Sequence, residues 1–248
     1  MEHGHAPAAL QGRVIHKYKM KAIALSIILT FILAPPSYAG ESICYGTTSR
    51  GCLENGVKLP VKGPNFRAYS KLASMLRRTY VHSKVRSIIL SSYNDLQETY
   101  PNNKYVYGET GWPSGGRFKP HETHQNGLSV DFMVPLIRED GEPIEIRTSV
   151  FNKYGYGVDF DAEGKNGKIT IDYESMAEHI YTLHKATLEL GDDIYRIIFA
   201  LNLQRYLFET KRGKYLKENI NFNEKPSRVR HDDHYHVDFY IDCEPYDG

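Results

Sequence analysis

The chain has 248 residues, of which 41% are hydrophobic and 25% are charged, and its formal net charge is +1. These fractions are those of an ordinary globular protein with a sizeable buried core, so they exclude a disordered chain and a fibre. The near-neutral charge offers no polycationic surface, and we therefore expect no nucleic acid partner.

The first 39 residues have the plan of a secretory signal peptide. Lys17, Lys19 and Lys21 precede an uncharged run at 22–34, and small residues before Gly40 form a cleavage motif. The run of 13 residues is too short to span a bilayer comfortably. We expect cleavage after residue 39, export to the periplasm and no stable membrane anchor, with an uncleaved anchor as the alternative. Translation starts at the first residue or at Met20, in which case residues 1–19 are an upstream extension.

The remaining residues, 40–248, are expected to form one domain. Removing four basic and one acidic residue from totals of 31 and 30 leaves 27 and 29, a net charge of −2. Three cysteines remain, Cys44, Cys52 and Cys243, so one disulfide and one free thiol are expected in an oxidising compartment. Cys243 pairs with Cys44 or Cys52, which ties the chain ends together, or Cys44 and Cys52 close a small local loop.

Hydrophobic periodicity predicts helices and strands in a mixed order. Helices are expected at 66–80, 83–100, 174–190 and 203–219, with Ser83 as an N-cap. Strands are expected at 104–109, 128–134, 195–201 and 234–241, a glycine-rich loop at 110–120, and a loop or hairpin at 155–173. The sum is an α+β domain with a central, largely antiparallel sheet and flanking helices.

Five of the eleven histidines fall in two tight groups, at 121–124 and 231–236. In the second group, His234 and His236 lie two residues apart on a strand, so their side chains share one face. Tyr235 and Val237 then point into the core. A single zinc site could use one of the two histidines as a ligand. The other histidine is left beside the open fourth position, where hydrolysis needs a proton acceptor.

The first group ends in Asp131, which lies on the polar face of an otherwise apolar strand. A buried carboxylate there needs a strong partner, and a metal ion is one. His124 precedes the strand, and Gly127 gives the backbone room to bend between them. With His236, these residues make three nitrogen and oxygen ligands on the sheet face and leave one zinc position open, as catalytic zinc requires.

These residues resemble a known family. A histidine, an aspartate seven residues later and a distant H-x-H resemble the group of lysostaphin-type enzymes, D-Ala-D-Ala metallopeptidases and hedgehog-like domains. The segments Gly-Gly-Arg-Phe at 115–118, H-x-x-H-Q-x-G at 121–127 and H-x-x-H-x-H-V at 231–237 are similar to the penicillin-insensitive murein endopeptidases. This resemblance covers most of residues 40–248.

The resemblance implies a Zn²⁺ ion bound by His124, Asp131 and His236, with His234 as the catalytic base. His121 and His231 would line the site and position the water or stabilise the oxyanion. The implied substrate is the stem peptides of peptidoglycan, at the D-alanyl–meso-diaminopimelyl cross-link.

The groove around the site is expected to have walls formed by the loop at 155–167, Trp112 and Arg117. Arg117 is a candidate to pair with a carboxylate of the stem peptide.

Three other functions are compatible with parts of the pattern. A D,D- or L,D-carboxypeptidase would share every metal ligand and differ only in the groove. A non-catalytic zinc module that binds the cell wall would not need His121, His231 or His234. A histidine-metal nuclease is disfavoured by the signal peptide and the negative charge of residues 40–248.

Overall fold

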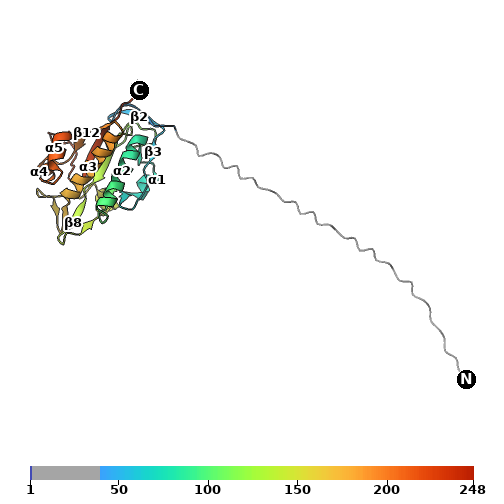
Figure 1. The fold of residues 1–248 in the computed structure, drawn as a ribbon. Coiled ribbons are helices and arrows are strands. Elements are labelled where there is room, and N and C mark those ends of the chain that lie inside the picture. Colours follow the sequence, from blue (N-terminus) through green and yellow to red (C-terminus); the bar gives the residue numbers. More distant parts are fainter. Residues whose placement is uncertain (2–39) are drawn as a thin grey trace. The chain divides into compact units, whose positions relative to one another are not determined.

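The computed structural model describes Met1 and residues 40–248 (Figure 1). The predicted extension, signal peptide and cleavage site therefore lie outside the described residues, apart from Met1. The largest sheet has five strands: Phe66–Ala68 (β4), Tyr105–Tyr107 (β6), Ser129–Met133 (β7), Asp193–Ile198 (β12) and His234–Tyr240 (β13). The helices are Lys71–Met75 (α1), Ser83–Thr99 (α2), Tyr173–Glu189 (α3), Leu201–Phe208 (α4) and Gly213–Asn219 (α5), with a 3-10 helix (η1) at Val150–Gly155.

Three smaller sheets surround the large one. The hairpin of Ile43–Thr47 (β1) and Arg50–Glu54 (β2) forms one, and Val57–Lys58 (β3) with Tyr80–Val81 (β5) forms another. The third has four strands: Leu136–Arg138 (β8), Pro143–Ile144 (β9), Lys165–Asn166 (β10) and Ile169–Ile171 (β11). The strands β10 and β11 are the hairpin expected within 155–173.

The five-stranded sheet confirms the predicted α+β class. Its order is β12-β13-β7-β6-β4, and only the pairing of β4 with β6 is parallel. Antiparallel pairing of β13 with β7 places His236 opposite Asp131 and Asp238 opposite Ser129. The two strands that carry the chemical motifs are therefore neighbours at the middle of the sheet.

The two faces of this sheet have opposite chemistry. On one face, Phe132 and Tyr235 stack with ring centroids 5.5 Å apart, and His179 of α3 packs on Phe132 and hydrogen-bonds to Tyr235. Helices α2 and α3 pack side by side in the same region (Figure 1). Because alternate residues of a strand point to opposite faces, Asp131 and His236 lie on the other face.

Helix α2 confirms the predicted helix at 83–100, since it buries Val85, Ile88 and Ile89 at helical spacing. Its N-cap is His82 rather than the predicted Ser83, because the His82 Nδ1 atom accepts a hydrogen bond from the Lys84 amide at 3.2 Å. Helix α3 begins after Asp172, whose carboxylate accepts from the Ser175 amide at 3.0 Å.

The predicted helix at 66–80 is wrong for most of its length. Residues 66–68 form β4 in parallel with β6, and only α1 is helical. Leu72, Met75 and Leu76, which a helix at 66–80 would place near one face, are 49%, 69% and 58% exposed. Pairing with a strand almost 40 residues away overrides the local helical pattern. Likewise, the single helix expected at 203–219 is two helices, α4 and α5.

A disulfide joins Cys44 to Cys243 and leaves Cys52 as a free, half-buried thiol. Of the pairings left open by the sequence, this one links segments 199 residues apart. Backbone hydrogen bonds between the same segments support it, since the Gly46 amide donates to Glu244 and the Glu244 amide donates to Cys44. Within the described residues, no helix has the length and apolarity needed to cross a bilayer.

Candidate functional site

The polar face of the five-stranded sheet lies at a groove of about 1340 Å³. The side chains that line it include Glu109, His121, His231, His234 and His236. Both histidine groups identified in the sequence are therefore brought together at one groove, although they lie more than 100 residues apart.

His124 and Asp131 form the most deeply buried pair of the site, at 0% exposure each. His124 has a left-handed backbone (φ +67°), and its ring Nδ1–H donates to the Thr110 carbonyl oxygen at 3.0 Å. The Nε2 atom is then an acceptor. It lies 3.3 Å from Asp131 Oδ1 and has no hydrogen-bond partner. Two acceptors that face each other in a buried place fit a cation between them.

The pKa directions agree with this arrangement. Burial lowers the pKa of His124 and so favours its neutral form, which is the form that binds metals. Burial opposes ionisation of Asp131, but the surrounding histidines, His124 first, outweigh it and hold the pKa of that carboxyl well below its usual range. A neutral imidazole beside an ionised carboxylate is a suitable donor pair for a divalent ion.

His236 approaches the same carboxylate oxygen from β13. Its Nδ1 atom lies 2.8 Å from Asp131 Oδ1, and its Nε2 atom lies 2.8 Å from Asp238 Oδ1. Burial lowers the pKa of His236, but the two carboxylates outweigh burial and raise it to about 10. Without a cation, a proton therefore bridges His236 and Asp131. A metal ion at Asp131 Oδ1 would take the place of that proton.

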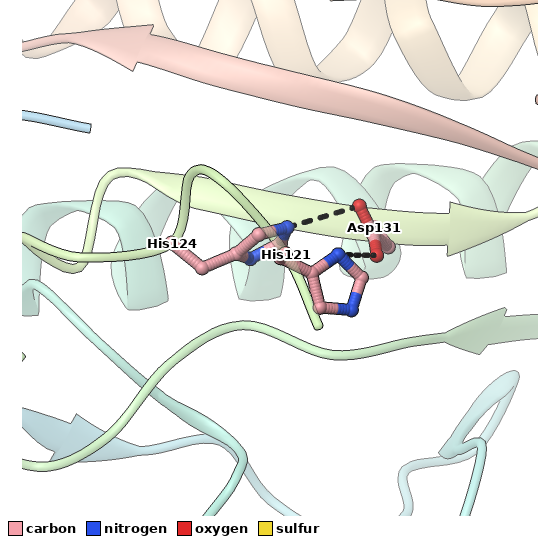
Figure 2. A group of neighbouring side chains, drawn as sticks. All are labelled: His121, His124 and Asp131. Carbon is pink, nitrogen blue, oxygen red and sulfur yellow. Dashed lines mark ion pairs between the residues drawn. The ribbon is translucent and has the colours of Figure 1, made fainter. Parts of the chain in front are cut away.

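His121 offers a competing ligand. The ligand atoms of His121, His124 and Asp131 all lie within 4.8 Å of one another, so these three side chains could hold a metal ion (Figure 2). The His121 Nδ1 atom is 3.9 Å from Asp131 Oδ2, and its Nε2 atom is 2.6 Å from Glu109 Oε2. Burial lowers the pKa of His121, but Glu109 and Asp131 outweigh that effect and raise it.

Glu109 is a buried carboxylate that the sequence did not single out. It accepts hydrogen bonds from Tyr69 at 2.6 Å and from Arg78, as well as contacting His121. Burial works against its ionisation, yet these partners lower its pKa to about 2. Glu109 is the last residue of the predicted strand at 104–109, and nothing in its local sequence indicates these partners.

His234 and Asp233 form a second, separate pair. The His234 Nδ1 atom lies 2.6 Å from Asp233 Oδ1, so the ring donates this proton and keeps Nε2 as an acceptor. Burial raises the pKa of Asp233, although its contact with His234 works in the opposite direction. An imidazole oriented by a carboxylate is the arrangement of a general base.

His231 is neutral at physiological pH, because burial and then the neighbouring His234 lower its pKa to about 4. Its Nδ1–H donates to the Val229 carbonyl oxygen at 2.7 Å, which leaves Nε2 as a hydrogen-bond acceptor. The rings of His231 and His234 lie 4.6 Å apart between centroids. This geometry favours His231 as a group that orients water rather than one that donates to an oxyanion.

Tyr156 completes the surroundings of Asp131. Its hydroxyl donates to Asp131 Oδ2 at 2.8 Å and accepts from the Glu109 amide at 2.8 Å. Gly108 permits this approach, because a Cβ atom there would lie 2.3 Å from the hydroxyl. Lys153 and Tyr154, just before it, have left-handed backbones. Such conformations are costly and concentrate at functional sites.

Trp112 and Arg117 do not lie among the residues that line the groove. Trp112 lines a different hollow and packs against Phe118, with ring centroids 5.1 Å apart, and against the Arg78 guanidinium. Arg117 is exposed, and its carbonyl oxygen accepts from the Trp112 indole at 3.3 Å. The two expected walls at Trp112 and Arg117 therefore lie outside this groove. Of the loop at 155–167, Tyr156 does line the groove.

A buried carboxylate among clustered imidazoles beside a groove is an arrangement that could hold a metal ion. Comparison with known proteins identifies the family. The family model for penicillin-insensitive murein endopeptidases matches residues 44–246, and the chain belongs to this family. Over 102 residues it is 31% identical to the penicillin-insensitive murein endopeptidase of Pectobacterium atrosepticum. That match covers 41% of this chain and about a third (35%) of the relative.

Proposed function

We propose that this protein is a zinc-dependent endopeptidase that hydrolyses D-alanyl–meso-diaminopimelyl cross-links of peptidoglycan in the periplasm. The observation that carries the proposal is the partnerless His124 Nε2 atom, which faces Asp131 Oδ1 beside His236 Nδ1. Family membership supports the murein substrate. None of these three side chains is a cysteine, which favours a catalytic rather than a structural zinc site.

In this proposal His124 Nε2, Asp131 Oδ1 and His236 Nδ1 hold the metal ion. Zinc, when bound, supplies a positive charge that polarises the scissile carbonyl and makes water more acidic. The protein fixes these ligands from behind, since Thr110 holds the far nitrogen of His124 and Asp238 holds the far nitrogen of His236. The hydrogen bond with Glu109 holds His121 beside the three proposed ligands rather than among them.

His234 acts as the general base. Asp233 accepts its Nδ1–H, so Nε2 is the free nitrogen that takes a proton from the attacking water. The neighbouring His231 accepts a hydrogen bond at Nε2 and orients that water. His121 is the group suited to stabilise negative charge on the substrate, because its pKa is raised. The proton held by His234 then passes to the leaving amine.

The test is digestion of Gram-negative sacculi by the purified protein, followed by mass-resolved chromatography of the muropeptides. The expected result is loss of cross-linked dimers and a matching gain of monomers, abolished by a chelator and restored by zinc. Release of free D-alanine with the dimers unchanged would support a carboxypeptidase instead. Binding to sacculi without any product would support a non-catalytic cell-wall module.

A further inference from the structure

Asp238 is a fully buried carboxylate within β13, on the same sheet face as the candidate metal ligands. The register of the sheet places Ser129 of β7 on one side of it and Arg196 of β12 on the other. Three donors converge on its two oxygens. Ser129 Oγ donates to Oδ1 at 2.6 Å, His236 Nε2 donates to Oδ1 at 2.8 Å, and Arg196 Nε donates to Oδ2 at 2.8 Å.

These contacts suit an ionised Asp238, since a hydroxyl, an imidazole N–H and a guanidinium N–H all donate to its oxygens and Arg196 supplies a positive charge. An ionised carboxylate only accepts hydrogen bonds, so the proton between it and His236 belongs to the imidazole. Once a metal ion has replaced the proton at Nδ1, Nε2 therefore remains the protonated nitrogen of a neutral His236 ring.

The consequence lies at the opposite edge of the ring. When Nε2 carries the proton of a neutral imidazole, Nδ1 has the lone pair, and Nδ1 is the atom that faces Asp131 Oδ1 at 2.8 Å. If Nδ1 carried the proton instead of Nε2, a protonated nitrogen would face the metal position. A carboxylate behind a ligating histidine is known to set both its tautomer and its ring orientation.

We propose that Asp238 is a positioning residue that presents His236 Nδ1 to the metal ion, and that Arg196 and Ser129 hold Asp238 for this task. The inference rests on the proposed function and deepens it. It assigns a role in metal binding to a residue that does not contact the metal ion.

The Asp238→Asn variant tests this role. An asparagine has one acceptor oxygen, and Arg196 at the Oδ2 position attracts it. The amide NH₂ group then faces His236 Nε2 and favours the wrong tautomer. Zinc affinity, measured by competition with a chromophoric chelator, is expected to fall about 10- to 100-fold. The matched control Asp242→Asn makes the same change at an exposed aspartate that follows the strand, and it should change the affinity by less than about twofold.

A double variant separates positioning from simple structural damage. In Asp238→Asn with Arg196→Met, the donor at the Oδ2 position is gone, so the amide can turn its oxygen back to His236 Nε2. Zinc affinity should recover by at least about threefold relative to Asp238→Asn alone. Additive weakening in the double variant would overturn the proposal.

A spectroscopic measurement on the parent protein covers the case in which Asp238→Asn fails to fold. The ¹⁵N shifts of the zinc-loaded protein should show His236 protonated at Nε2 and metal-bound at Nδ1. Metal binding through Nε2, or an Asp238→Asn variant that binds zinc as tightly as the parent, would overturn the role of Asp238 alone. A parent protein that binds no zinc would overturn the proposed function, and this inference with it.

Discussion

Removal of the Tyr156 hydroxyl should lower both the unfolding free energy of the protein and its affinity for zinc. The Tyr156→Phe change keeps the ring against His234, 4.8 Å away between centroids, and deletes only the oxygen. Two hydrogen bonds disappear, one to the ionised Asp131 and one from the buried Glu109 amide. A bond to a charged group contributes about 1.5–3 kcal/mol, and an unpaired buried amide costs about 1–3 kcal/mol. We therefore expect the unfolding free energy of the metal-free protein to fall by about 2.5–6 kcal/mol, the sum of the two contributions.

Urea unfolding in the presence of a chelator measures this loss, and chelator competition measures zinc binding. Asp131 Oδ2 without its donor is free to rotate, so zinc affinity should also fall, by about tenfold or more. Tyr154→Phe is the matched control, since Tyr154 lies in η1 close to Tyr156 and its hydroxyl makes no hydrogen bond with any described residue. It should change stability by less than about 0.5 kcal/mol. A Tyr156→Phe protein with the stability and zinc affinity of the parent would refute the role given to this hydroxyl.

Three further predictions concern the base, a buried histidine and the disulfide. His234→Ala should keep zinc affinity within about threefold but lower kcat by about 10²–10⁴-fold, whereas His236→Ala should lose both; normal turnover by His234→Ala would contradict the base assignment. Burial lowers the pKa of His179 to about 3, so the folded state keeps it neutral while the unfolded chain takes up a proton below its ordinary pKa of about 6.5. The contribution of neutral His179 to the unfolding free energy is complete above about pH 6.5 and is lost as the pH falls toward 3. Between pH 8 and pH 5 the unfolding free energy falls by about 2 kcal/mol from this source. In urea unfolding with a chelator present, the unfolding free energy of His179→Gln should fall less between these pH values than that of the parent protein. An equal fall in the two proteins would contradict the role given to His179. Replacing Cys44 and Cys243 together by serine should lower the unfolding free energy by about 2–5 kcal/mol, while Cys52→Ser, which breaks no disulfide, should change it little.

Much of the fold could be predicted because the central strands have a strong local pattern. Strands β7 and β13 alternate between apolar and polar residues, and this alternation predicts both their position and their polar face. The placement of His236 opposite Asp131 depends on the register between two distant strands, which alternation alone does not define. The error at 66–80 has the same origin, since β4 exists only because β6 pairs with it.

The candidate site was predicted where its residues form motifs and was missed where they act through tertiary contacts. His121, His124 and Asp131 lie within 11 residues, so their grouping is visible in the sequence. Tyr156 reaches Asp131 from a loop 25 residues away, and Glu109 reaches His121 from the end of β6. Asp238 was recognisable as a polar-face residue of its strand, but its partners come from two neighbouring strands.

The central claim is that His124, Asp131 and His236 hold a zinc ion and that His121 does not. A crystal structure of the zinc-loaded protein, with diffraction data on both sides of the zinc absorption edge, tests it most directly. We predict one strong anomalous peak bonded to His124 Nε2, Asp131 Oδ1 and His236 Nδ1, with His121 still paired to Glu109. A peak bonded to His121 in place of His236, or no peak between His124 and Asp131, would contradict the claim.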